Sequence, residues 1–149
     1  MTPLDQRARS SVTLLIPTVH HRASFFARAL HHVSVSGFRG PIVVSDHSSP
    51  EHSDAIGAIT KRYGGLDIEV LCHAPDTHFL TRLILCATAA GTPYVHLHAD
   101  DDFLVIATLD RLVREMERDA ACVAAMGVNL HVRLDNGDVS PLRKTAVLG

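Results

Sequence analysis

The segment Val12-Thr-Leu-Leu-Ile16, which Pro17 ends, determines the architecture predicted for this chain. A short apolar run rich in β-branched residues predicts a strand that is buried on both faces. From Arg22 to about Val35, apolar residues then recur at steps of three and four, which is the period of an amphipathic helix. A buried strand followed directly by a helix is the beginning of a βαβ unit.

The same alternation repeats along the rest of the chain. Further strands are expected at 42–44, 68–71, 94–98 and 122–134, and further helices at 51–63, about 77–90 and 108–119. Asp76 or Thr77 is the expected N-cap of the helix near 77–90, and Asn136-Gly137 indicates a turn, typical of a hairpin. This order predicts an α/β fold with a mostly parallel sheet and helices on both faces.

Composition limits the class of protein and its partners. The 149 residues are 46% hydrophobic and 20% charged, which fits one soluble globular domain, and the net charge of −2 gives no basic field for nucleic acid or an anionic membrane. No apolar run approaches the roughly 20 residues that span a bilayer. The three cysteines show no disulfide or metal spacing, so we expect them to be reduced and mostly buried in a cytoplasmic protein.

The chain is expected to hold one domain with two irregular ends. We expect residues 1–11 to form a flexible leader, because they are polar and lack the apolar core of a signal peptide. Residues 12–134 form the α/β domain in this interpretation, and residues 135–149 form a tail.

Three segments follow predicted strands directly, and ligands in parallel sheets bind outside the carboxyl ends of the strands. They are Pro17-Thr18-Val-His20, Asp46-His47-Ser48-Ser49 and Asp100-Asp101-Asp102. The glycine-rich phosphate loops GxGxxG and GxxxxGK[ST] are absent, so a nucleotide bound here needs another group to neutralise its phosphates.

The acidic triplet Asp100–Asp102 could supply that group by binding a cation. Three adjacent carboxylates repel one another unless they are solvated or bridged by a cation. Their oxygens suit Mg²⁺ or Mn²⁺, which share one or two protein carboxylates with substrate phosphates. A solvated loop or a charge cluster at a helix N-terminus is the alternative interpretation of the same residues.

Other polar residues near these strand ends have two interpretations each. Thr18 and Asp46 could hydrogen-bond a base or ribose, or they could cap a turn. Arg22 and Arg82 could contact phosphate, or they could be helix-surface cations. The pairs His20-His21 and His31-His32 are expected on the surface of the first helix.

His96-Leu-His98-Ala-Asp100 gives a different hypothesis. In a strand the period of two places these three side chains on one face, and the pattern is similar to the HxHxD zinc cluster of metallo-hydrolases. Two partly buried histidines under a helix are the alternative. No nucleophile elbow of the GxSxG type occurs.

Together the three segments resemble the nucleotide-binding half of family-two glycosyltransferases, which have the Rossmann-like GT-A fold. Val12-Thr-Leu-Leu-Ile-Pro-Thr18 with Arg22 is similar to the family's first strand and its P-T-x-N-R turn. Ile42-Val-Val-Ser-Asp-His-Ser-Ser49 resembles the second strand with its D-D-x-S ending. Thr92–Phe103 resembles the fourth strand and the DXD motif, and the likeness covers about residues 12–130.

The resemblance implies a site for a UDP- or GDP-sugar donor. Thr18 would lie beside the base and ribose, Asp46 would recognise the base, and Asp100, Asp101 and Asp102 would hold Mn²⁺ or Mg²⁺ against the diphosphate. The complete set of donor-site residues expected is Thr18, His20, Arg22, Asp46, Ser48 and Asp100.

Three departures from the family pattern affect this interpretation. His20-His21 stands where the family has Asn, and Ser45 replaces the first Asp of the D-D pair. In the family the acceptor site and the catalytic base come from a portion after the fifth strand, and residues 135–149 contain no matching motif. The catalytic residue is therefore left unknown, because no base is visible in this chain, and we expect self-association through apolar surface that a half-domain leaves uncovered.

The leading function is therefore a glycosyltransferase-like domain that binds a nucleotide-sugar donor through a divalent metal, for transfer to an acceptor that the sequence does not identify. A non-catalytic nucleotide-sugar-binding module or a truncated half-domain is the first alternative. A zinc-dependent hydrolase using His96, His98 and Asp100 is the second. The sequence gives neither the donor sugar nor its base, nor the stereochemistry of transfer.

Overall fold

The computed structural model describes residues 11–127, 130–132 and 139–141. Its main sheet has four parallel strands in the order β3-β2-β1-β4. Their bounds are β1 Val12–Thr18, β2 Ile42–Asp46, β3 Ile68–Cys72 and β4 Tyr94–Leu97. This parallel sheet confirms the α/β class predicted from the alternating pattern.

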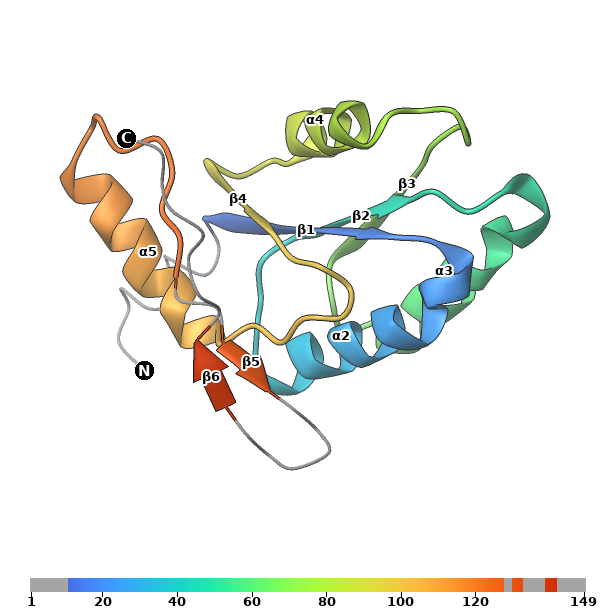
Figure 1. Ribbon diagram of the computed structural model, residues 1–149, viewed down its shortest axis with the longest axis horizontal. Coiled ribbons are helices and arrows are strands. Elements are labelled where there is room, and N and C mark those ends of the chain that lie inside the picture. Colours follow the sequence, from blue (N-terminus) through green and yellow to red (C-terminus); the bar gives the residue numbers. More distant parts are fainter. Residues whose placement is uncertain (1–10, 128–129, 133–138, 142–149) are drawn as a thin grey trace.

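Helices cover both faces of the sheet, as predicted. They are α2 Ala23–Val35, α3 Ser53–Thr60, α4 Phe79–Ala89 and α5 Ile106–Arg118, with the short 3-10 turns η1 His20–Arg22, η2 Pro50–His52 and η3 Lys61–Tyr63. Figure 1 shows α4 on one side of the sheet and α2 and α3 on the other. The predicted cap of α4 is wrong, because His78 takes that position and its Nδ1 accepts from the Leu80 amide at 3.3 Å.

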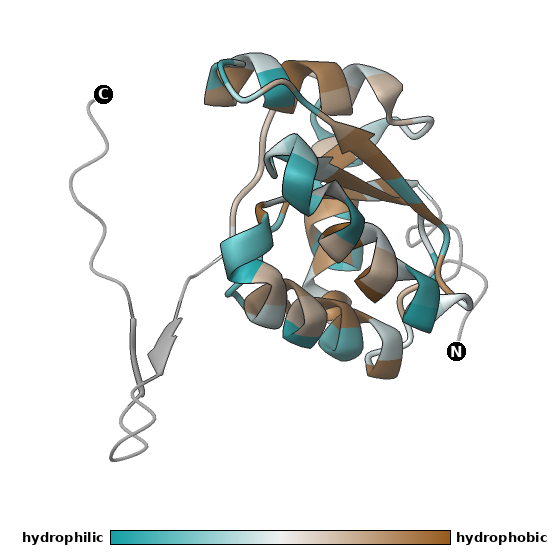
Figure 2. Ribbon diagram, turned by 90° about the vertical axis from the view of Figure 1, so that its right-hand side faces the viewer, coloured by the Kyte–Doolittle hydropathy of each residue, from teal (hydrophilic) through white to brown (hydrophobic). Residues whose placement is uncertain are grey.

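The two faces of the sheet have cores of different size. On one face α2, α3 and α5 bury a large cluster that includes Phe26, Leu30, Ile56 and Leu109. On the other face α4 buries a small cluster, Leu15, Val43 and Cys86, with Leu71 and Leu83 at its edge. In Figure 2 the strands are mostly brown between the two helical layers. The α4 side is thus the less completely covered side.

The predicted fifth strand at 122–134 is wrong as a member of this sheet. Residues 122–127 have no regular structure, and β5 Leu130–Val132 pairs antiparallel with β6 Val139–Pro141 in a separate sheet. The apolar composition misled the prediction, since alanine, methionine and glycine dominate 124–127 and have little β propensity. The predicted boundary at 134/135 and the Asn136-Gly137 turn lie outside the described residues, between these two strands.

Two further expectations concern the cysteines and membrane spans. All three cysteines are free thiols, but only Cys86 is buried, and Cys72 is exposed because β3 is an edge strand. The expectation of mostly buried cysteines is therefore wrong. None of the helices in the described ranges is both long and apolar enough to cross a bilayer. Of the expected leader, only Ser11 is described, and its carbonyl accepts from the Tyr94 amide at 3.2 Å.

Candidate functional site at the carboxyl ends of β1 and β4

The order of the sheet reverses at β1. The chain moves outward from β1 to β2 and β3, and then returns to place β4 on the other side of β1. Such a reversal leaves a crevice at the carboxyl ends of the two strands, because the connections leave them in opposite directions. Thr18 ends β1, and the loop Ala99–Asp101 follows β4, so the crevice lies between two of the segments selected from the sequence.

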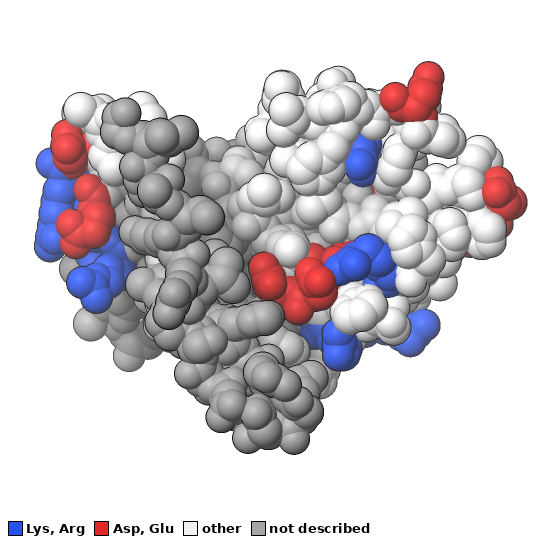
Figure 3. Space-filling view, in the orientation of Figure 1, with Lys and Arg blue, Asp and Glu red and all other residues white. Residues whose placement is uncertain are grey.

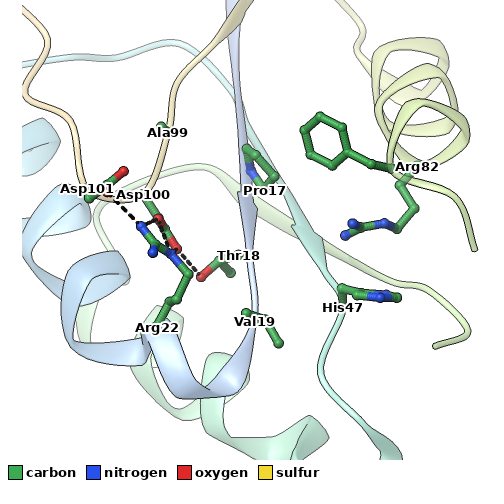
Figure 4. Close-up of a pocket in the computed structure, with 10 residues that line it drawn as sticks. Pro17, Thr18, Val19, Arg22, His47, Arg82, Ala99, Asp100 and Asp101 are labelled. Carbon is green, nitrogen blue, oxygen red and sulfur yellow. Dashed lines mark hydrogen bonds and ion pairs between the residues drawn. The ribbon is translucent and has the colours of Figure 1, made fainter.

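Arg22 joins the two sides of this crevice. Its Nε donates to Asp100 Oδ1 at 2.8 Å and to Oδ2 at 3.0 Å, while its Nη2 lies 2.6 Å from Asp100 Oδ1 and 2.8 Å from Asp101 Oδ2. Thr18 Oγ1 donates to Asp100 Oδ2 at 2.9 Å. Figure 4 shows these contacts as dashed lines. Both oxygens of the Asp100 carboxylate therefore have protein partners.

A protein cation thus neutralises much of the acidic triplet. The Asp100 side chain is 4% exposed and the Arg22 side chain 35% exposed, so the pair is only partly accessible to water. Hydrogen bonds to Asp100 and then to Asp101 raise the pKa of Arg22, which keeps the guanidinium charged. From the sequence, the adjacent carboxylates were expected to need a cation to offset their mutual repulsion. Arg22 is such a cation.

A cleft of about 260 Å³ lies beside this cluster. Its lining includes Thr18, Arg22, Asp100 and Asp101 on one side and His47 and Arg82 on the other. In Figure 4 the guanidinium of Arg82 points toward His47, across from Thr18. Within the described residues, Arg82 Nε and His47 Nδ1 are buried without a hydrogen-bond partner. Both side chains line the cleft, and these two nitrogens have no partner among the described residues.

Sequence analysis placed Arg82 among the candidates but missed His47 and Phe79, which also line the cleft. His47 sits inside the Asp46–Ser49 turn and could have been chosen for its position after β2. Phe79 carried no signal, because it becomes part of the cleft only when α4 folds back over the sheet. The Arg82 guanidinium carbon stands 5.4 Å from the centre of the Phe79 ring, a cation–π contact.

Three residues predicted for the donor site do not line the cleft. Asp46 is 1% exposed, and its Oδ1 accepts from the Ser48 amide at 2.8 Å and from Ser48 Oγ at 2.6 Å. This is an Asx turn, the alternative left open for Asp46. His20 lies in η1, and its ring stacks on that of His52 with centroids 4.0 Å apart. Ser48 is a partner of Asp46.

The acidic triplet does not form a three-carboxylate cage. In the described part of the chain, no three His, Cys, Asp or Glu side chains are grouped so that they could hold a metal ion. Asp100 is engaged by Thr18 and Arg22, Asp101 is 47% exposed and also pairs with Arg22, and Asp102 is exposed. A divalent ion held by the acidic triplet therefore stays a prediction from the sequence.

The arrangement proposed for zinc does not occur. The rings of His96 and His98 lie 6.2 Å apart and Asp100 turns toward Arg22, so the three do not converge. β4 ends at Leu97, and the alternation that would have placed Asp100 beside the histidines ends with it. His98 is 3% exposed, and burial lowers its pKa to about 4, so the ring is neutral.

Comparison with known proteins identifies neither a family nor a function for this chain. No protein-family model matches the chain, and no curated protein matches it either. The resemblance to family-two glycosyltransferases therefore depends on the residues quoted above and on the geometry that they adopt.

Proposed function

We propose that the cleft between β1 and β4 binds the nucleoside diphosphate part of a nucleotide sugar, in the manner that the resemblance to family-two glycosyltransferases implies. One observation carries the proposal. The segments after β1 and β4, far apart in the sequence, meet through Thr18, Arg22 and Asp100 at the reversal of the sheet, beside a cleft. Open α/β sheets bind nucleotides at this position.

The charge in the cleft supports an anionic ligand that brings a metal. Arg22 and Arg82 balance Asp100 and Asp101 among the lining residues, and Arg22 is already engaged by both carboxylates. A diphosphate adds at least two negative charges, so the single charge of Arg82 does not suffice to neutralise it. A divalent ion on Asp101 and Asp102 would supply the remaining charge and would stabilise the negative charge on a departing nucleoside diphosphate.

The volume of the cleft is small for a ligand-binding site. Its volume of about 260 Å³ is near the lower limit for small-molecule pockets. We infer that the described residues contact the diphosphate and its nearest groups. Arg82 and His47 line this volume, and the guanidinium of Arg82 would pair with phosphate oxygens.

A binding module without turnover is the second candidate. The two carboxylates that line the cleft, Asp100 and Asp101, are both held by Arg22. Both oxygens of Asp100 and Oδ2 of Asp101 thus already have partners within the protein, so neither carboxylate is placed as a free general base. Transfer would need a base from outside the described residues, whereas binding would not.

The test is calorimetric titration of the chain with UDP and with GDP, each with and without Mn²⁺. We expect Mn²⁺-dependent binding of one nucleotide, weakened at least tenfold by Asp101→Asn combined with Asp102→Asn, and by Arg82→Met. Asp67→Asn and Arg62→Met are the matched controls, because both side chains are exposed and neither lines the cleft.

Two results would contradict the proposal in different ways. If neither nucleotide binds, the nucleotide-binding function is wrong. If a nucleotide binds equally well without a divalent ion and with Asp101 and Asp102 replaced, the predicted metal site is wrong. The cleft then binds phosphate through its arginines alone. Turnover of the bound nucleotide sugar, measured as release of nucleoside diphosphate, separates the enzyme from the binding module.

A further inference from the structure

The carboxylate of Asp100 is fully occupied by partners within the protein. Its Oδ1 lies 2.8 Å from Nε and 2.6 Å from Nη2 of Arg22. Its Oδ2 accepts from the same Nε at 3.0 Å and from Thr18 Oγ1 at 2.9 Å. A carboxylate offers about four lone-pair sites. These contacts use all of them, so Asp100 has no site left for a metal ion.

Arg22 also engages the neighbouring carboxylate. Its Nη2 lies 2.8 Å from Asp101 Oδ2, so a single nitrogen bridges Asp100 and Asp101, and Figure 4 shows the guanidinium against both. In Figure 3 acidic and basic side chains adjoin near the middle of the face that is shown. Within the described contacts, what remains for a cation is the second oxygen of Asp101 and the exposed carboxylate of Asp102.

Two turns and an aromatic ring hold this arrangement. The Arg22 amide donates to the Val19 carbonyl at 2.8 Å and closes the turn η1. The Asp102 amide donates to the Ala99 carbonyl at 3.2 Å and closes the turn that carries the carboxylates. The guanidinium carbon of Arg22 lies 5.0 Å from the centre of the Phe25 ring, a cation–π contact. A cation arriving from water therefore meets a counter-ion that is already held in place.

We propose that Arg22 excludes divalent cations from the acidic triplet as long as no nucleotide is bound. A divalent ion would have to displace the guanidinium from Asp100 and Asp101, or bind beside it and be repelled by its like charge. The remaining oxygens are too few, because Mg²⁺ and Mn²⁺ bind through one or two carboxylates where phosphates supply further ligands. The triplet that the sequence selected for a metal ion therefore holds none in the nucleotide-free chain.

The exclusion depends only on the contacts that Arg22 makes with the two carboxylates. Arg22 also lines the cleft, so the phosphates of a bound nucleotide would offer its guanidinium other oxygens and would add ligands for an ion. This joint binding of ion and nucleotide is the one part of the inference that rests on the proposed function.

The test is titration of the full chain with Mn²⁺ alone, followed through the paramagnetic resonance signal of the unbound ion. We expect Arg22→Met to bind Mn²⁺ at least tenfold more tightly than the unchanged chain, because the substitution frees both carboxylates and removes the competing charge. Adding Asp100→Asn to Arg22→Met should remove most of this gain. Arg22→Gln also lacks the charge but keeps an amide that can donate to Asp100, so it gives the same readout if Arg22→Met does not fold.

Arg28→Met is the matched control, because it removes the same charge from the same helix. The guanidinium carbon of Arg28 lies 4.7 Å from the centre of the Phe25 ring, but in the described part of the chain Arg28 forms no ion pair with the triplet. Its replacement should leave Mn²⁺ binding unchanged, and circular dichroism verifies the fold of each variant.

Three results would overturn the proposal. The first is tight Mn²⁺ binding by the unchanged chain, equal to that of Arg22→Met. The second is an Arg22→Met chain that binds Mn²⁺ no better than the unchanged one, and the third is an equal gain in Arg28→Met. No nucleotide enters this experiment, so a failure of UDP and GDP to bind would contradict the proposed function and leave the exclusion by Arg22 standing.

Discussion

Replacing Arg22 with methionine removes the guanidinium from Asp100 but keeps a side chain of similar length. Asp100 is 4% exposed and would keep only the hydroxyl of Thr18 as a partner. Breaking a fully buried ion pair costs about 3–5 kcal/mol, and because Arg22 is itself 35% exposed we expect a smaller loss, about 2 kcal/mol, in the free energy of unfolding. Urea denaturation followed by circular dichroism measures this loss directly.

The ion pair is isolated by a double-mutant cycle. Asp100→Asn alone leaves Arg22 without its main partner, whereas Arg22→Met with Asp100→Asn leaves no buried charge. We therefore expect the double variant to be more stable than the sum of the two losses predicts, by about 1 kcal/mol or more.

A surface pair provides the control for this cycle. Arg118 and Glu115 form an ion pair of 2.7 Å, but their side chains are 69% and 52% exposed. Exposed pairs of this kind contribute about 0–1 kcal/mol, so Arg118→Met should have little effect. Equal losses for Arg22→Met and Arg118→Met, or strictly additive losses in the cycle, would refute the inference that Arg22 is the counter-ion of a buried carboxylate.

Three other predictions concern single residues. His98 takes up a proton near pH 6.5 in the unfolded chain, whereas burial lowers its pKa in the folded chain to about 4. The free energy of unfolding should therefore fall by about 3 kcal/mol as the pH drops from 6.5 toward 4. In thermal melts, His98→Leu should lose this part of the pH dependence. Thr18→Val should cost about 1–2 kcal/mol in urea denaturation through its lost hydrogen bond to the Asp100 carboxylate, and Thr18→Ser much less. In mass-spectrometric alkylation the exposed Cys72 should react before the buried Cys86; equal rates would contradict the packing of α4 on the sheet.

The sequence predicted the architecture because the signals for it are local. Apolar runs such as Ile42–Val44 and the helical period of 22–35 describe each element by itself, and β2 and α2 form where expected. The carboxyl-end rule selected the segments after β1 and β4, and the structure brings these two segments into contact through Thr18, Arg22 and Asp100. The fifth strand failed because apolar character at 122–127 does not distinguish a strand from an exposed irregular segment, and Val123 is 91% exposed.

What the sequence by itself determined is therefore the alternation of elements and the identity of the polar residues at one edge of the sheet. What only the tertiary structure decided is how those residues pair. Arg22 and Asp100 were each singled out, one for phosphate and the other for metal, and the placement of β4 beside β1 joins them instead. Local pattern cannot encode such a contact, because a charge pair across 78 positions depends on strand order and on the turn that ends each strand.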